Sequence, residues 1–300
     1  MKRIVIGSLI IGLMAACNPT EKRLSETFDW QGHRGARGNM PENTWPAFQL
    51  AMDAAMTTLE MDVVISGDSQ VVVSHEPFMS HEICLDTAGE KITEASEKQF
   101  NIYQMTYDEV REFDCGSTIH PRFLKQEKRA VQKPLLKEIL RKVKLYAQSH
   151  DLPLPYLNVE IKYVAGQEGV YHPDIALFSQ LVFEVLNEGY PVEKWNIQSF
   201  DFDVLKYWHE SYPNIKLTAL VEDNIDLGSQ LAYLGFVPEI YSPNYLLLNA
   251  SNISAIHEKG MFIIPWTVNE KEEMMRLKKM GVDGIITDYP KVAAELKDIQ

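Results

Sequence analysis

The chain has 300 residues, of which 45% are hydrophobic and 24% are charged, and it carries a formal net charge of -13. This composition is typical of a folded globular protein, and the length fits either two domains or one α/β barrel of about 250 residues. The negative charge argues against nucleic acid or an anionic membrane surface as a partner, because both would repel the protein.

The first residues have the pattern of a bacterial export signal. Lys2 and Arg3 precede an apolar run over residues 4–13, which is too short to span a bilayer. Small residues follow and end at Cys17, an arrangement that resembles the lipobox of bacterial lipoproteins. We therefore expect residues 1–16 to be a signal peptide that is removed, and Cys17 to carry lipid.

A lipid on Cys17 predicts a place in the cell envelope. Asn18 follows the cysteine at the position where aspartate is the usual inner-membrane retention signal. We therefore expect the protein at the outer membrane, facing the periplasm. Residues 17–27 would form a polar tether, and the lipid anchor would be the only contact with the membrane. A secreted protein without an anchor is the alternative.

The first motif of the folded part covers residues 31–44, which read QGHRGARGNMPENT. Its glycines favour a loop after a short strand, and Asn43 or Thr44 can cap the helix that follows. His33 and Arg34 lie side by side in this motif. An acid–base group beside a guanidinium suits chemistry on phosphate, because arginine presents a planar fork of donors to the oxygens.

The second motif, LEMD, lies on the next predicted strand. Its Glu60 and Asp62 are two positions apart, so both carboxylates point to the same face of that strand. The two negative charges would repel each other unless a cation lay between them, and an oxygen-binding divalent metal meets this need. A turn at Gly67 and Asp68 predicts a hairpin, whose returning strand ends at His75.

Residues 77–132 interrupt the alternation of strands and helices and are interpreted as an insertion. Cys84 and Cys115 lie within it. With Cys17 assigned to lipid, these two remaining cysteines suggest a disulfide in an oxidising periplasm. Two separate buried thiols are the alternative.

Strand-like and helix-like segments alternate over the rest of the chain. Strands are expected at residues 30–33, 59–66, 70–75, 156–162, 195–199, 216–221, 240–242, 261–268 and 284–287. Helices are expected at 44–55, 107–113, 135–149, 173–188, 202–211, 229–234, 253–259, 271–280 and 291–299. About eight strands in this alternation predict a (β/α)8 TIM barrel over residues 28–298, with a small insertion after the second and third strands.

The candidate site residues share one position in this barrel, the C-terminal ends of the strands, where TIM-barrel enzymes place their chemistry. They are His33, Glu60, Asp62, His75, Glu160, Lys162, Gln198 and Trp266. Later blocks complete the pattern, namely NVEIK at 158–162, QSF at 198–200, WTVN at 266–269 and DGIITDYP at 283–290.

Together with HRG, PENT and E-x-D, these blocks resemble the glycerophosphodiester phosphodiesterase family, in the same order. The resemblance covers roughly residues 28–298. One position departs from it, because the family usually has aspartate after the second histidine and this chain has Glu76. We interpret this as a change in the support of His75, without loss of function.

The resemblance implies general acid–base catalysis by His33 and His75, since two imidazoles that titrate near neutral pH can serve as base and acid. It also implies that Glu60, Asp62 and Glu160 bind a divalent metal, Mg²⁺ or Ca²⁺. An all-oxygen ligand set suits these hard cations and disfavours zinc. Which histidine is the acid is left open, as is the choice of metal.

The resemblance further implies how the substrate is held. Arg34 and Lys162 are expected to contact phosphate, Trp266 to pack on the glycerol carbons, and Gln198 to hydrogen-bond substrate hydroxyls. Residues 287–288, by contrast, are expected only to finish the last strand and its turn.

The implied reaction is metal-dependent hydrolysis of glycerophosphodiesters to sn-glycerol 3-phosphate and an alcohol. A lysophospholipase D-type reaction on the same barrel is one alternative, which an apolar groove in the insertion would favour. A catalytically silent lipoprotein that binds or scaffolds at the envelope is the other, and it predicts that a site residue is missing. The preferred head group and the oligomeric state stay open.

Overall fold

The structure is a computed structural model that describes residues 27–297. Parallel strands form its centre. In this part of the chain the neighbours follow the order β8-β7-β6-β5-β4-β2-β1-β9, while β3 pairs only with β2. The strands are β1 (Asp29–Gly32), β2 (Thr58–Ile65), β3 (Val71–Val73), β4 (Tyr156–Ile161), β5 (Trp195–Ser199), β6 (Lys216–Val221), β7 (Ile240–Pro243), β8 (Phe262–Ile263) and β9 (Gly284–Thr287).

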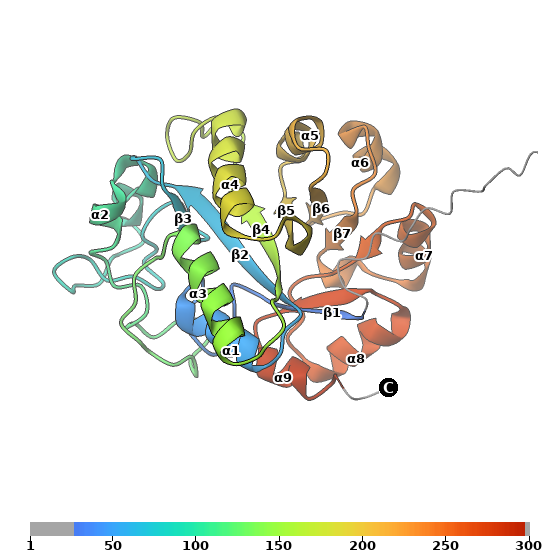
Figure 1. Ribbon diagram of the computed structural model, residues 1–300, viewed down its shortest axis with the longest axis horizontal. Coiled ribbons are helices and arrows are strands. Elements are labelled where there is room, and N and C mark those ends of the chain that lie inside the picture. Colours follow the sequence, from blue (N-terminus) through green and yellow to red (C-terminus); the bar gives the residue numbers. More distant parts are fainter. Residues whose placement is uncertain (1–26, 298–300) are drawn as a thin grey trace, which may run out of the picture.

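Helices surround these strands on the outside (Figure 1). The α-helices are α1 (Trp45–Asp53), α2 (Tyr107–Val110), α3 (Leu136–Ser149), α4 (Ile175–Gly189), α5 (Phe202–Ser211), α6 (Leu227–Leu234), α7 (Ala250–Glu258), α8 (Lys271–Met280) and α9 (Pro290–Ala294). Short 3₁₀ helices lie in the connections, at η1 (Glu97–Gln99), η2 (Ile102–Gln104), η3 (Val192–Lys194) and η4 (Tyr245–Leu247).

Hydrogen bonds between the last two strand segments close the barrel. The amide of Asp283 donates to the carbonyl of Ile263 at 2.9 Å, and the amide of Ile286 donates to the carbonyl of Pro265 at 2.9 Å. Pro265 has no N–H to donate, and β8 has 2 residues where a longer strand was predicted. The predicted (β/α)8 barrel is confirmed.

A hairpin returns the chain to the mouth of the barrel. β2 and β3 are antiparallel, with Val63 opposite Val73. Directly after β3, the amide of Ser74 donates to the carbonyl of Asp62 at 3.0 Å. This register brings His75 back beside the carboxylates of β2.

Residues 74–135 form the insertion, and its apolar side chains form one hydrophobic cluster together with Val64 of β2 and Val72 of β3. Cys84 and Cys115 form a disulfide within this cluster, the pairing that the sequence favoured. The buried ammonium of Lys133 donates to Ser74 Oγ at 2.8 Å. The end of the insertion therefore packs against the hairpin that carries His75.

The central strands are buried on both faces, as expected for parallel strands covered by helices. In β2, Leu59, Met61 and Val63 join the main hydrophobic core. Glu60 and Asp62 alternate with them, so their side chains point to the interior of the barrel. One strand thus supplies both the core and the site.

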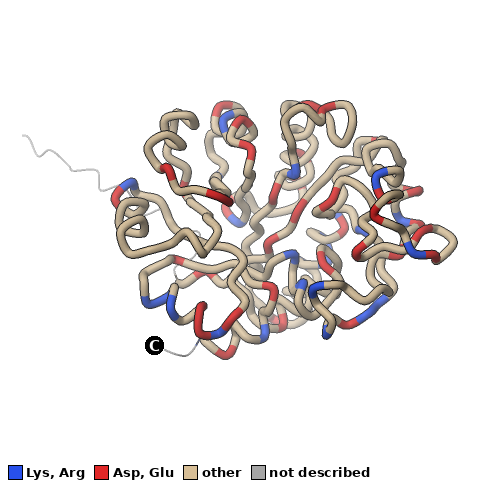
Figure 2. Tube along the Cα trace, turned by 180° about the vertical axis from the view of Figure 1, so that it is seen from behind, with Lys and Arg blue, Asp and Glu red and all other residues tan. Residues whose placement is uncertain are grey.

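The predicted signal peptide, Cys17 and most of the tether lie outside the described residues. Among residues 27–297, no helix has the length and apolar character needed to cross a membrane. Figure 2 shows Lys and Arg interspersed with Asp and Glu along the described trace.

Candidate active site

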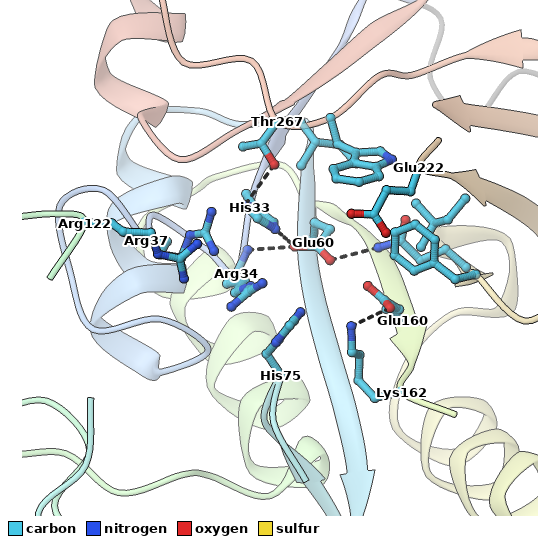
Figure 3. A pocket seen from close by; sticks show the side chains of 15 residues that line it. His33, Arg34, Arg37, Glu60, His75, Arg122, Glu160, Lys162, Glu222 and Thr267 are labelled. Carbon is cyan, nitrogen blue, oxygen red and sulfur yellow. Dashed lines mark hydrogen bonds and ion pairs between the residues drawn. The ribbon is translucent and has the colours of Figure 1, made fainter. Parts of the chain in front are cut away.

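A pocket of about 390 Å³ opens at the C-terminal ends of the strands. Nearly all the predicted site residues line it, as Figure 3 shows for those it labels. They are His33, Arg34, Glu60, His75, Glu160, Lys162, Gln198 and Trp266. The structure therefore brings together residues that are spread over more than 230 positions of the sequence.

Three buried carboxylates form a compact cluster at this pocket. Oxygen atoms of Glu60, Asp62 and Glu160 lie within 4.8 Å of one another. Asp62 Oδ1 is buried and has no hydrogen-bond partner among the described residues. Buried acceptors are almost always satisfied, so this oxygen is suited to be a ligand of a cation. An all-oxygen set of carboxylates is the ligand chemistry of a hard divalent metal.

Neighbouring donors hold the carboxylates of β2 in place. Gln198 Nε2 donates to Glu60 Oε1 at 2.8 Å, and the backbone amide of Arg34 donates to Glu60 Oε2 at 2.7 Å. Asn43 Nδ2 donates to Asp62 Oδ2 at 2.8 Å. These bonds leave Asp62 Oδ1 as the open ligand position.

The crowding of negative charge changes the pKa of each carboxyl. Burial, reinforced by Asp62, raises the pKa of Glu60 well above its usual value. Burial also raises the pKa of Glu160 to about 7, although Lys162 opposes the shift through an ion pair at 2.7 Å. Burial would raise the pKa of Asp62 too, but Arg34 outweighs it and lowers that pKa. A bound cation would therefore stabilise the charged forms of Glu60 and Glu160 most, because their pKa values are the ones that are raised.

A left-handed turn of the backbone places Arg34 in the wall of the pocket. Arg34 has φ of 47° and Gly35 has φ of 83°, a left-handed turn that glycine adopts at little cost. A Cβ on Gly35 would lie 2.6 Å from the carbonyl carbon of Ala47, so only glycine fits against α1. Arg34 Nη1 then donates to Glu42 Oε1 at 2.7 Å, which fixes the guanidinium beside the carboxylates.

His33 is oriented by a residue from the far end of the chain. Its Nδ1 donates to Asp288 Oδ1 at 2.7 Å. Asp288 also accepts hydrogen bonds from Arg37 Nε at 2.8 Å and Asn269 Nδ2 at 2.8 Å. Burial and the nearby Arg37 lower the pKa of His33 to about 4, against the opposing effect of Asp288. His33 is therefore neutral at pH 7, with Nε2 directed toward Glu60, 4.0 Å from its Oε2.

His75 has a carboxylate partner of its own. Its Nδ1 donates to Glu76 Oε1 at 2.6 Å, so the glutamate that departs from the family pattern still supports the histidine. Burial and the neighbouring Arg34 lower the pKa of His75 below its usual value. In Figure 3 the ring points into the pocket. Both imidazoles are thus fixed through Nδ1, which leaves Nε2 for chemistry.

Two residues have roles that the sequence did not reveal. Asp288 was expected only to finish the last turn, but its bond to His33 corrects that expectation. The signal was available, because Asp288 directly follows β9 at the same end of the barrel as His33. Gln198 lines the pocket and also positions Glu60, while its Oε1 accepts from Asn158 Nδ2 at 2.9 Å. Trp266 forms part of the pocket wall, with Nε1 bonded to the Ser242 carbonyl.

Comparisons with known proteins agree with this geometry. The model of the glycerophosphoryl diester phosphodiesterase family matches residues 33–292. A glycerophosphodiester phosphodiesterase of Bacillus altitudinis is 28% identical over 89% of this chain and 96% of its own length. A lysophospholipase D of Mus musculus is 25% identical over 89% of this chain and 84% of its own length.

A crystal structure assigned to a glycerophosphoryl diester phosphodiesterase of Silicibacter pomeroyi matches this chain with a TM-score of 0.79 and 29% identity. The match covers 89% of this chain and 91% of the crystallised chain. The family match spans most of the chain. The protein therefore belongs to the glycerophosphoryl diester phosphodiesterase family, as its sequence motifs indicated.

Proposed function

We propose that the protein hydrolyses glycerophosphodiesters to sn-glycerol 3-phosphate and an alcohol. The observation that carries the proposal is the placement of His33 and His75 around one pocket with a buried cluster of three carboxylates. Phosphodiester cleavage needs a base, an acid and positive charge near phosphate. The pocket supplies all three.

Glu60, Asp62 and Glu160 would hold a divalent metal, Mg²⁺ or Ca²⁺, which suit an oxygen-only ligand set. A cation bound there would neutralise the non-bridging phosphate oxygens and the charge that develops on them. The free Asp62 Oδ1 and the raised pKa of Glu60 support this role.

The two histidines would move the protons of the reaction. One imidazole accepts the proton of the attacking hydroxyl, for which the free glycerol hydroxyl of the substrate is suited, and the oxygen attacks phosphorus. The bond from phosphorus to the alcohol breaks, and the other imidazole, which must enter this step with a proton on Nε2, donates that proton to the departing alkoxide. Water then opens the resulting cyclic phosphate by the reverse proton movements. Asp288 and Glu76 keep each ring in the required orientation.

The remaining residues would bind the substrate. Arg34 and Lys162 present positive charge to the phosphate oxygens, since both line the pocket beside the carboxylates. Trp266 would pack on the glycerol carbons. Gln198 would contribute a hydrogen bond to substrate in addition to its bond with Glu60.

The lysophospholipase D alternative is supported by the mouse relative but has less support in the insertion. Met79 and Cys84 are buried in the cluster of the insertion, and Ile83 packs against it. None of these three side chains lines the active-site pocket, so they add no apolar wall to it for a long acyl chain. The alternative of a silent binding protein predicted a missing site residue, and the proposed catalytic and metal residues are all present.

The reaction is tested by release of glycerol 3-phosphate from glycerophosphocholine and glycerophosphoethanolamine. We expect release to stop with EDTA and to return with Mg²⁺ or Ca²⁺. His75→Ala should lower kcat by about 10²- to 10⁴-fold, because it removes one proton-transfer group. A folded protein that releases nothing with either metal would refute the proposed substrate class.

Asp288→Asn tests the support of His33. We expect kcat to fall by about 10- to 100-fold with little change in KM, because the mutation misaligns a group needed only in the transition state. Asp283→Asn is the matched control, since Asp283 also flanks β9 but bonds to His257 and the amide of Ile263. Equal effects of both substitutions on kcat would show that Asp288 is merely structural.

We also propose that Cys17 carries the lipid that anchors the protein at the outer membrane. The support is the sequence pattern before the cysteine. In a bacterial host, the wild-type protein is expected in the membrane fraction and Cys17→Ser in the soluble fraction. Recovery of both proteins in the soluble fraction would contradict the anchor.

A further inference from the structure

The pocket is not uniform in charge along its length. Arg34, Arg37 and Arg122 line it near the histidines, whereas Glu222 lines it on another side. Figure 3 shows Glu222 across the pocket from Arg37 and Arg122, with Glu60 between them. A bound phosphodiester would therefore have basic groups near its phosphate and a separate carboxylate near one of its two organic arms.

Glu222 is available to a ligand. It follows β6 directly and is exposed, and within residues 27–297 it makes no hydrogen bond or ion pair. The proposed metal ligands, in contrast, are buried and bonded to neighbours. Glu222 is thus distinct from the metal cluster in both position and environment.

Two aromatic side chains, Phe200 and Trp266, line the same pocket as this carboxylate. Phe200 follows β5, and its ring meets that of Trp266 at right angles, with centroids 5.4 Å apart. Phe200 remains 39% exposed, so part of the ring is open to a ligand. An aromatic face next to a carboxylate attracts an alkylammonium group through cation–π and Coulomb interactions. Lys162 lies 5.9 Å from the same ring, but its charge is compensated by Glu160.

The pocket has room for such a group beyond Phe200. A more open hollow of about 650 Å³ adjoins it and shares Phe200, Leu220 and Glu222 as a common wall. The other charged residues that line this hollow are Asp201, Asp203 and Asp223. No Lys or Arg is among its lining residues. A cation that passes Phe200 therefore meets no positively charged side chain in the lining of the hollow.

We propose that Glu222 and Phe200 form a subsite for a cationic head group, so that the protein prefers glycerophosphodiesters of an amino alcohol or quaternary ammonium alcohol. The proposal rests on the function proposed above. Glycerol lies on Trp266 and phosphate at the carboxylate cluster, and the second arm extends past Phe200 toward Glu222. Glu222 thereby determines specificity without taking part in bond cleavage.

The test compares glycerophosphocholine with glycerophosphoglycerol, whose head group is neutral. With the full-length protein in detergent, we expect KM to be roughly tenfold lower for the choline diester, because an exposed cation–π contact and a surface ion pair add small attractions. Glu222→Gln should reduce this preference by about threefold through KM alone. Phe200→Leu should act in the same direction by about threefold. Glu258→Gln, on the exposed side of α7, is the matched control and should change nothing.

Binding of both diesters to His75→Ala, measured by calorimetry, separates this subsite from the reaction. Equal Kd values for the two ligands, or equal effects of Glu222→Gln on both, would overturn the cationic subsite even if hydrolysis is observed. A preference in Kd without any hydrolysis by the wild-type protein would support the subsite and refute the proposed reaction. Failure of both ligands to bind would refute both.

Discussion

The barrel forces three carboxylates together, and their mutual repulsion constrains the residues that surround them. Glu60 and Asp62 share one face of β2, and Glu160 lies opposite Asp62 on β4. Parallel pairing fixes this register, so the side chains cannot separate without breaking the sheet. Their environment instead supplies donors and cations, from Gln198, the backbone of Arg34 and Lys162. A divalent cation bound between these carboxylates would relieve the same repulsion.

A layer of polar side chains inside the barrel is hydrogen-bonded to the site through Gln198. Asn158 Nδ2 donates to both Gln31 Oε1 and Gln198 Oε1 at 2.9 Å, and Asn196 Nδ2 donates to Asn158 Oδ1 at 2.6 Å. Gln198 therefore accepts a hydrogen bond from Asn158 in the polar layer and donates one to Glu60 in the site. Hydrogen bonds of this kind restrict side-chain movement, which suits a site whose ligands must stay in fixed positions. Asn196 Oδ1 is a member of the layer that has no hydrogen-bond partner among the described residues.

Much of the fold and site could be predicted from sequence because the signals were local. The spacing of Glu60 and Asp62 on a strand, and the glycines around His33, each follow from the geometry of one short segment. The partner of His75 is its sequence neighbour Glu76, whereas the partner of His33 required a tertiary contact. Asp288 lies 255 positions from His33, and only closure of the barrel brings them together.

The limits of the elements were harder to predict than their order. β8 was expected over residues 261–268 but has only 2 residues, because Pro265 cannot donate to a neighbouring strand. Likewise, Gln198 was expected to bind substrate, but its position in the polar layer gives it a structural bond to Glu60 as well. Both features depend on contacts between strands that are distant in the sequence, so no single segment predicts them.

The cluster of Glu60, Asp62 and Glu160 is expected to bind a divalent metal. Calorimetric titration of the protein with Mg²⁺ and Ca²⁺ tests it most directly, with Asp62→Asn as the variant and Glu258→Gln as the control. We expect binding of one ion to the wild-type and control proteins, and a loss of affinity of at least about tenfold in Asp62→Asn, because a charged ligand is removed. Equal affinity in all three proteins, or no binding by the wild-type protein, would contradict the account.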